Sequence, residues 1–479
     1  MASNTTPAPS TLRQLADLIS TSVDQIDALF DKEGFNYPSL DGSFNPKSPE
    51  EALSMRPEVV KVAMIAIAAC GQLSATINMP AMTLFDAVGG FHVSSCIRTV
   101  VATNVAEILR GHSQGLHVND ISAQNGVEPS KLARILRLLA THHFFIETAP
   151  DVFRLNRLSS MLDTMKTLDE IKADPENKYT GTSGIGAIVE HTGDEMFKAS
   201  AYMTETLVDP KKGYSDAPED TPLARAFNMN KSVWEWFEEP GNEYRLKRFA
   251  SAAEGFYKMK PGAILAGFKW GSLPAGSVIV DVGGGSGHNM LTIYKEHPEL
   301  KFVVQDREAV IQQAHKFWES NGLVEAIKEG KVTLQVHDFF DSQDIEPPAV
   351  FLCSMIMHDY GRALAEKILK HLRNAASRDT RLLILDQIVP YAAPHDTIQD
   401  IGDEIRGAEQ QPVPPPLLPN LGKASAMTYL GDLQMYIGLN GEGRTLGSYV
   451  DLLRSAGWKI NEIYPITGAI QIQIVATPL

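Results

Sequence analysis

A glycine-rich segment, DVGGGSGH, follows an apolar β-branched run and precedes a helical pattern. Glycines allow the backbone to take positive φ and to approach a ligand closely. A loop of this kind also cradles the pyrophosphate of a dinucleotide at a helix N-terminus, but His288 stands where the third glycine of the GxGxxG pattern belongs. The residues predict a ligand-binding loop and disfavour NAD. Its candidate ligand-binding residues are Asp281, Gly283, Gly285 and Gly287.

Acidic and aromatic side chains follow the next two β-branched runs. Asp306 ends the run KFVVQD, where a carboxylate can accept hydrogen bonds from ribose hydroxyls. Asp338 and Phe339 follow the run KVTLQVH and can hold an adenine by its amino group and by stacking. Each residue alone is equally well explained as a polar strand end. Because ligands bind at the carboxyl ends of parallel strands, the three positions together predict a nucleoside site.

A histidine follows the fourth run, AVFLCSM. The segment there reads SMIMHDY and contains Ser354, His358 and Asp359. A single histidine on a helix is usually structural, but His358 stands at the strand end where a reaction would take place. The three cysteines are widely spaced and form no CxxC pair, and we predict no metal site.

The elements that must position these residues alternate from residue 276 onward. The runs SVIVDV, KFVVQD, KVTLQVHD, AVFLCSM and RLLILDQIV are separated by helical patterns, which predicts an α/β, Rossmann-like domain with helices on both faces of a parallel sheet. Two last runs, KINEIYPI and AIQIQIVAT, are joined by a Thr467-Gly468 turn and predict an antiparallel hairpin. The proline-rich stretch Gln411–Asn420 is expected to be an insertion without regular structure.

Helical periodicity dominates the first 160 residues. Apolar spacing predicts a helix at Leu84–Leu109, broken near Gly89-Gly90, after two earlier helices at Gln14–Phe30 and Glu51–Ile77. The pattern that follows is that of a winged helix: a short helix from Val118, a turn, a helix at Lys131–Leu139 and a hairpin at Phe144–Leu155.

The winged-helix pattern allows two interpretations. The geometry is shared with DNA-binding proteins, but the second helix offers only Lys131, Arg134 and Arg137 as bases. The formal charge of -15, from 43 Lys+Arg and 58 Asp+Glu, opposes binding to nucleic acid. We therefore predict a dimerisation or substrate-lid module at 1–160, an inserted helical segment at 161–260 that contributes to the substrate pocket, and a catalytic domain at 261–479.

Composition also bears on the compartment. The apolar stretch Val60–Ala69 contains Lys61 and is about half of the roughly 20 residues that a membrane span needs. The first ten residues, MASNTTPAPS, lack the basic and apolar regions of a secretory signal. Widely spaced cysteines suit a reducing cytosol. We expect a soluble, cytoplasmic protein without a membrane partner.

These motifs together resemble a known family, the S-adenosylmethionine-dependent O-methyltransferases typified by plant caffeate and flavonoid enzymes, with many fungal relatives. The likeness extends from residue 84 to the C-terminus, outside the insertions. It rests on the glycine loop, the His358-Asp359 pair and the Arg444-Thr445 start of the last helix. A parallel sheet that ends in a hairpin is also typical of methyltransferases. The resemblance implies S-adenosylmethionine as cofactor and a hydroxyl, expected to be phenolic, of a small aromatic molecule or secondary metabolite as acceptor.

The resemblance also implies roles for individual residues. The glycine loop, Asp306, Asp338 and Phe339 match the cofactor contacts, and Ser354 stands where plant members have a lysine near the cofactor. His358 matches the general base, which is needed because a phenol with a pKa of about 10 is ionised in only roughly one molecule in a thousand near pH 7. Asp386 falls at the family's first acid. The second acid aligns with Gly443, so its carboxylate is one position early, at Glu442.

Two further expectations come with the resemblance. Family members have intertwined N-termini, so we expect a homodimer, in agreement with the apolar Leu84–Leu109 stretch. Some fungal proteins of similar sequence bind S-adenosylmethionine yet rearrange their substrate as pericyclases or cyclases. The retained His358-Asp359 pair favours methyl transfer over this alternative.

Overall fold

The computed structural model describes residues 9–259, 262–394, 405–409, 412–466 and 471–479. The chain divides into two compact units. The first contains residues up to Glu205 together with Pro222–Met259 and Pro415–Leu417, and the second contains Thr206–Thr221, Lys260–Pro414 and Leu418–Leu479.

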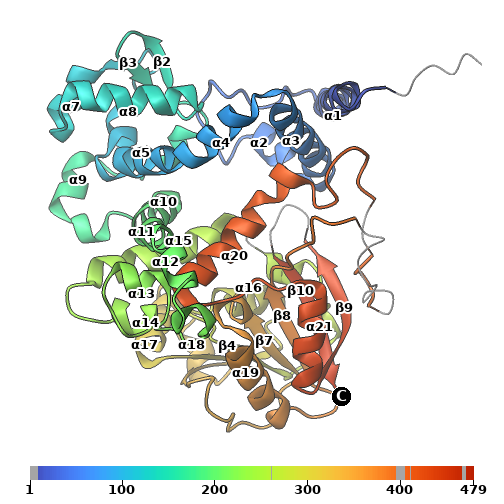
Figure 1. The fold of residues 1–479 in the computed structure, drawn as a ribbon. Coiled ribbons are helices and arrows are strands. Elements are labelled where there is room, and N and C mark those ends of the chain that lie inside the picture. The colour runs from blue at the N-terminus through green and yellow to red at the C-terminus, as the bar shows by residue number, and fades with distance from the viewer. Residues whose placement is uncertain (1–8, 260–261, 395–404, 410–411, 467–470) are drawn as a thin grey trace, which may run out of the picture. The chain divides into compact units, whose positions relative to one another are not determined.

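A seven-stranded sheet forms the centre of the second unit (Figure 1). Its spatial order is β6-β5-β4-β7-β8-β10-β9. The first five strands pair in parallel, and β10 pairs antiparallel with both β8 and β9. The strands are β4 (Val278–Val282), β5 (Lys301–Asp306), β6 (Val332–Val336), β7 (Val350–Ser354), β8 (Arg381–Asp386), β9 (Trp458–Pro465) and β10 (Ile472–Pro478).

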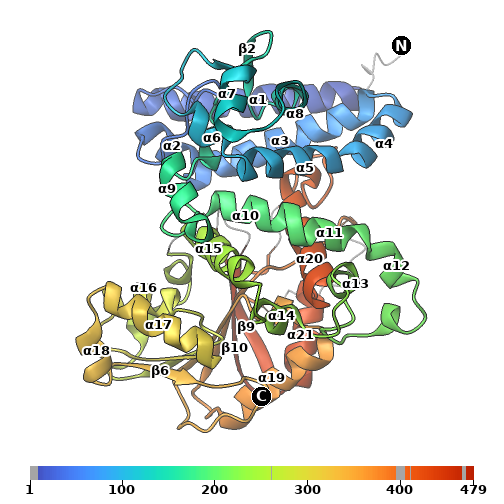
Figure 2. The same ribbon diagram turned by 90° about the vertical axis from the view of Figure 1, so that its left-hand side faces the viewer.

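Helices cover both faces of this sheet because its central strands are apolar on both sides. In β4, Val280 and Val282 pack in one core with α19 (Arg362–Ala375) and α21 (Leu446–Ser455). Ile279 packs in a second core with α16 (His288–Glu296), α17 (Glu308–Ser320) and α18 (Val324–Lys328), which Figure 2 shows in front of the sheet. The predicted α/β class and the antiparallel ending are confirmed.

Two predicted connections fall wholly or partly outside the described residues. The Thr467-Gly468 turn of the last hairpin is one of them. Of the proline-rich stretch, residues 412–420 are described and contain no helix or strand. After it come a short 3₁₀ turn at Gly422–Ser425 and the helix α20 (Ala426–Leu439).

The N-terminal helices of the first unit are more broken than the periodicity predicts. The helix predicted at Glu51–Ile77 is two helices, α2 (Pro49–Ser54) and α3 (Pro57–Ile77), which follow α1 (Thr11–Glu33). The break falls at Arg56, whose ψ of 142° is extended, because a residue before proline disfavours helical geometry. The stretch Leu84–Leu109 spans α4 (Pro80–Gly89), α5 (Phe91–Ala102) and α6 (Val105–Leu109), with a second break at Asn104.

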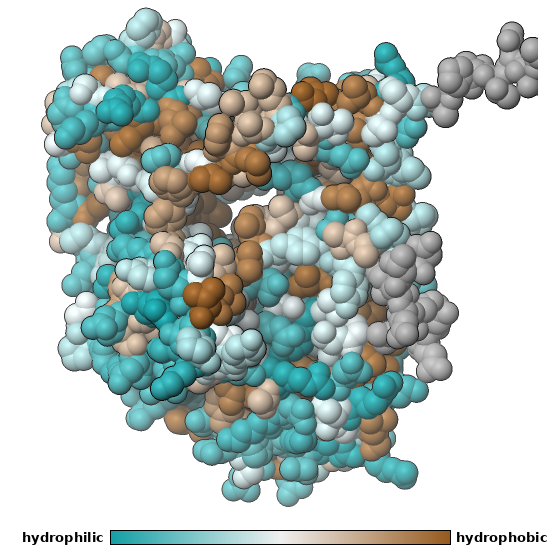
Figure 3. Space-filling view, viewed as in Figure 1, coloured by the Kyte–Doolittle hydropathy of each residue, from teal (hydrophilic) through white to brown (hydrophobic). Residues whose placement is uncertain are grey.

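Helix α3 is also longer and more apolar than the predicted stretch Val60–Ala69. Its most apolar 18-residue window has a mean hydropathy of 1.7, and by length and composition alone it could cross a membrane. Little of that window is buried within the chain. Exposed apolar surface continues over the neighbouring N-terminal helices (Figure 3).

The helix pair and hairpin predicted after residue 117 are present. Helix α7 (Val118–Asn125) turns at Gly126 into α8 (Pro129–Thr141), and strands β2 (Ile146–Ala149) and β3 (Val152–Arg154) form a small sheet with β1 (Leu116–His117). The rest of the first unit is helical. Its helices are α9 (Leu168–Ala173), α10 (Ile185–His191), α11 (Phe197–Ala201), α12 (Met203–Leu207), α13 (Pro222–Ala226), α14 (Val233–Phe237) and α15 (Glu243–Met259), of which α12 extends into the second unit.

Candidate active site

The glycine loop leaves the end of β4 and packs tightly against two neighbours. Gly283 has φ +66°, and a Cβ there would lie 2.7 Å from Cδ1 of Ile356. Gly287 has φ +83°, and its Cβ would lie 2.8 Å from the indole nitrogen of Trp318. Because L side chains rarely adopt this backbone region and have no space here, both positions require glycine. The loop therefore lies directly beside the segment that follows β7, which carries Ile356.

Asp281 is buried beneath this loop without a hydrogen-bond donor. Neither of its carboxylate oxygens has a partner among the described residues. Burial, together with the nearby charge of Asp306, raises the pKa of Asp281 to about 8. A buried polar group of this kind in a native structure calls for a partner such as water or a ligand. The carboxylate fits a ligand with a positive charge or hydrogen-bond donors.

The next two strand ends contribute Asp306, Asp338 and Phe339. Oδ2 of Asp306 accepts from the backbone N–H of Gly285 at 2.8 Å, which joins the second strand end to the glycine loop. Asp338 accepts from the backbone N–H of Phe340 at 2.9 Å. A Cβ added at Gly283 would lie 3.2 Å from Cε1 of Phe339. The structure thus brings the predicted nucleoside contacts of three separate strands to one edge of the sheet.

Ser354 lies close to the first turn of α16. Its hydroxyl accepts from the side-chain amide of Asn289 at 3.0 Å. The sequence predicts Ser354 as a cofactor contact but does not identify Asn289. The preceding residue, His288, entered the prediction only as the missing third glycine that disfavours NAD. Trp318 was also missed, although its indole N–H donates to the carbonyl of Ser286 in the loop at 3.1 Å.

His358 lies on a short 3₁₀ turn, Met357–Asp359, after β7. Its Nδ1 is 2.5 Å from Oδ1 of Asp386, and its backbone N–H donates to Oδ2 of the same carboxylate at 3.1 Å. Its Nε2 is 3.3 Å from Oδ1 of Asp359. Burial alone would lower the pKa of His358, but the two carboxylates outweigh it and raise that pKa to about 10. The two carboxylates therefore favour the protonated form of the ring.

Arg444 fixes the turn that carries the histidine. Its guanidinium is buried and donates to the carbonyls of Met357, at 2.5 Å, and Tyr360, at 2.7 Å. The backbone N–H of Glu442 donates to the carbonyl of His358 at 2.9 Å. From the sequence, Arg444 is recognised only as part of the family motif. The sequence pattern does not tell which backbone carbonyls a buried guanidinium will bind.

Glu442 does not supply the second acid in the way the alignment suggests. Its side chain is 45% exposed and forms an ion pair with Arg444 at 3.2 Å. At Gly443, a Cβ would lie 2.8 Å from Cγ of Asp432, whose carboxylate accepts from the Gly443 backbone N–H at 2.7 Å. Of the two predicted acids, Asp386 contacts the imidazole of His358, whereas Glu442 contacts His358 through its backbone.

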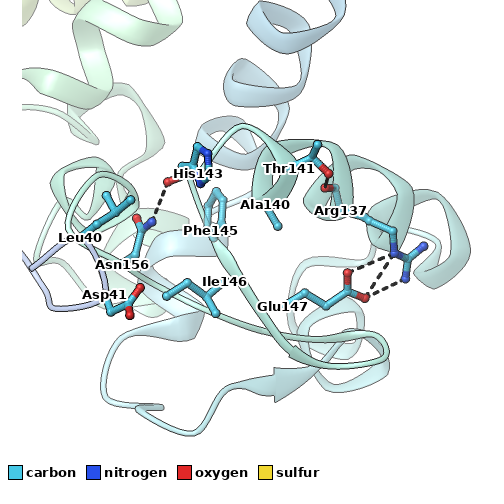
Figure 4. Close-up of a pocket in the computed structure, with 10 residues that line it drawn as sticks. All are labelled: Leu40, Asp41, Arg137, Ala140, Thr141, His143, Phe145, Ile146, Glu147 and Asn156. Carbon is cyan, nitrogen blue, oxygen red and sulfur yellow. Dashed lines mark hydrogen bonds and ion pairs between the residues drawn. The ribbon is translucent and has the colours of Figure 1, made fainter. Parts of the chain in front are cut away.

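A cavity of about 350 Å³ lies apart from these residues in the first unit (Figure 4). It is lined by the end of α8 and by the following hairpin. At one side Arg137 forms ion pairs with Glu147, at 2.9 Å, and Asp151, at 2.7 Å. One of the three basic residues of α8 is therefore neutralised within the unit, which weakens the DNA-binding interpretation of this helix.

The chain is similar to known O-methyltransferases in both units. Residues 214–405 match the O-methyltransferase domain, and residues 85–164 match the O-methyltransferase dimerisation domain. A protein named 4-O-methyltransferase 1, from Phanerochaete chrysosporium, is 38% identical over 460 residues, which are 95% of this chain and 96% of that protein.

Solved structures share the fold at lower identity. The mitomycin 7-O-methyltransferase MmcR is 19% identical with a TM-score of 0.63, covering 84% of this chain and 98% of its own. A pericyclic reaction enzyme is 14% identical with a TM-score of 0.65, covering 97% of this chain and 100% of its own. Likeness at these identities shows a common architecture, and it does not separate methyl transfer from rearrangement.

Proposed function

Because this chain belongs to the S-adenosylmethionine-dependent O-methyltransferase family, we propose that it methylates a phenolic hydroxyl of a small aromatic secondary metabolite, with His358 as the general base. The family is shown by a relative 38% identical over 95% of the chain. Enzyme class and cofactor follow from the family and agree with the sequence prediction. The phenolic acceptor and the roles of individual residues are the proposal.

The observation that carries the proposal is the His358–Asp386 pair. His358 follows β7, on the segment whose Ile356 lies against the glycine loop, and Asp386 ends the neighbouring strand β8. A carboxylate on Nδ1 fixes the ring and leaves Nε2 as the nitrogen that can exchange a proton with an acceptor. Proton removal by a positioned base contributes about 10²–10⁴-fold to a rate.

The residues present fit the cofactor. Asp281 offers an unpaired carboxylate to a cationic donor, and Asp306, which accepts from the backbone N–H groups of Gly285 and Arg307, ends the neighbouring strand with a carboxylate that ribose hydroxyls can bind. Asp338 and Phe339 would hold the adenine. When bound, S-adenosylmethionine supplies an electrophilic methyl group on a sulfonium. The chain's own contribution is to hold cofactor and acceptor in line and to take the acceptor's proton.

A homodimer is the second part of the proposal. Helix α4 carries exposed Leu84 (66%), Phe85 (67%) and Val88 (72%), and the matched dimerisation domain begins at residue 85. Contiguous apolar surface of this size marks an interface with protein or membrane. A second copy of the chain would cover it, so light scattering at low micromolar concentration should give about twice 52.5 kDa. A monomer would contradict this part.

One assay tests the activity. Purified protein is incubated with methyl-labelled S-adenosylmethionine and a panel of phenols, and products are identified by mass spectrometry. Labelled methyl ether on a phenol supports the proposal. A rearranged substrate without label would replace it by the pericyclase alternative, and neither product from a cofactor-binding protein would contradict both.

A further inference from the structure

The second acid expected next to His358 has no place at its usual position. Residue 443 is glycine, and the carboxylate of Asp432 already occupies the space in which a side chain at 443 would begin. The neighbouring acid, Glu442, is paired with Arg444. If a second carboxylate acts on the imidazole, it must come from another element.

Asp359 meets this requirement. Its Oδ1 is 3.3 Å from Nε2 of His358, on the ring edge opposite Asp386. The side chain of Asp359 is 14% exposed and that of His358 is 6% exposed, so Asp359 is the more accessible of the two. The backbone of the turn is held by Arg444 from both sides of this pair. The contact is therefore built into a fixed turn.

The contact also conflicts with general-base catalysis. A histidine can accept the acceptor's proton only through a free nitrogen lone pair, yet both nitrogens of His358 face carboxylates, which favour the protonated ring. Several charged or titratable side chains lie on the elements packed against this turn. They are Asp386 on β8, Asp432 on α20, Glu442 and Arg444 before α21, the phenol of Tyr449 on α21, and Asp216, near Gly361, from the segment Thr206–Thr221.

We propose that Asp359 is the second acidic partner of His358: its carboxylate holds Nε2–H of the resting imidazolium, and Nε2 can accept the proton of the acceptor hydroxyl only after the imidazolium has lost its own Nε2 proton to solvent. Asp359 is then a positioning residue that sets the pH at which the base becomes available. This inference rests on the proposed methyl transfer with His358 as base.

Asp359→Asn is the direct test, because the amide keeps the shape and removes the charge. An opposite charge at this distance shifts a pKa by about 1–3 units. The acid limb of kcat/KM for a phenol should therefore move at least one unit lower in Asp359→Asn, and the fraction of plateau activity retained at pH 7 should rise. Asp359→Glu should return the limb toward its wild-type position. Asp451→Asn, an exposed carboxylate on α21, is the matched control.

Histidine NMR provides a readout that does not depend on turnover. The resonance of His358 is assigned by its loss in His358→Gln, and its titration is followed in the enzyme saturated with S-adenosylhomocysteine. We expect the midpoint to fall by at least one unit in Asp359→Asn and to stay unchanged in Asp451→Asn. Retained affinity for S-adenosylhomocysteine shows that each variant is folded.

The outcomes separate the two ideas. An unchanged midpoint in Asp359→Asn, or a midpoint that moves only in Glu442→Gln, overturns the role of Asp359. Equal loss of activity at every pH without movement of the limb also overturns it, because that is the signature of a purely structural residue. A shifted midpoint in a protein that methylates no phenol supports the Asp359–His358 pairing and contradicts the proposed function.

Discussion

Replacing His358 by glutamine should separate proton removal from cofactor binding. The amide can still donate a hydrogen bond to Asp386, so the turn after β7 keeps its anchor, but it cannot take up a proton. The pKa of His358 is raised to about 10 by its two carboxylate neighbours, so the neutral ring that can accept a proton is the minority form near pH 7. The variant removes that form entirely.

The size of the effect follows from the loss of a positioned base. Its removal should lower kcat for a simple phenol by about 10²–10⁴-fold. Affinity for S-adenosylhomocysteine should change little, because the glycine loop, Asp281 and Asp306 are untouched. A nitrophenol already offers phenolate near neutral pH, so the deficit of His358→Gln should shrink on that acceptor.

Calorimetry with S-adenosylhomocysteine and initial rates on the two acceptors measure these quantities. Equal losses on both acceptors would refute proton removal as the role of His358 and leave it as a positioning residue. Full activity of the variant on the simple phenol would remove the histidine from the mechanism.

Three other substitutions test the cofactor site and the turn that carries His358. Asp306→Ala removes a charged acceptor whose hydrogen bonds are each worth about 1.5–3 kcal/mol. Calorimetry should therefore show S-adenosylhomocysteine binding about ten- to a hundredfold weaker. An unchanged affinity would mean that the ribose does not bind at Asp306. Gly283→Ala puts a Cβ 2.7 Å from Ile356 at φ +66° and should abolish cofactor binding or lower the melting temperature, whereas a wild-type result would contradict the packing. In Arg444→Lys, a single ammonium cannot bind the carbonyls of both Met357 and Tyr360 as the guanidinium does. We expect kcat to fall with little change in cofactor affinity. An unchanged kcat would show that Arg444 does not anchor the turn for catalysis.

The sheet could be predicted from sequence because each strand is short, apolar and bounded by turn residues. Strands buried on both faces leave a continuous signal, and their carboxyl ends collect the polar residues. For this reason the sequence places Asp306, Asp338 and Asp386 at or just after strand ends, where the structure also has them. The N-terminal helices were predicted less well, because periodicity does not show how strongly Pro57 or a left-handed Asn104 interrupts an apolar helix.

Contacts around the imidazole were the part that the sequence could not supply. Alignment places a carboxylate only to within a residue, and the direction of Glu442 is decided by the buried guanidinium of Arg444. Asp359 was visible in the sequence as half of a His-Asp pair, but adjacency does not tell whether a side chain turns toward its neighbour. Such choices depend on which polar groups remain to be satisfied once the backbone is packed.

The ionisation of His358 decides which proton transfers this site can perform. A neutral imidazole accepts a proton and serves methyl transfer, whereas an imidazolium donates a hydrogen bond and can polarise a substrate carbonyl. The carboxylates of Asp386 and Asp359 favour the imidazolium in this structure. Because the proposed methyl transfer to a phenol needs the neutral form, the proton on Nε2 must leave before the acceptor hydroxyl can replace Asp359 at that nitrogen.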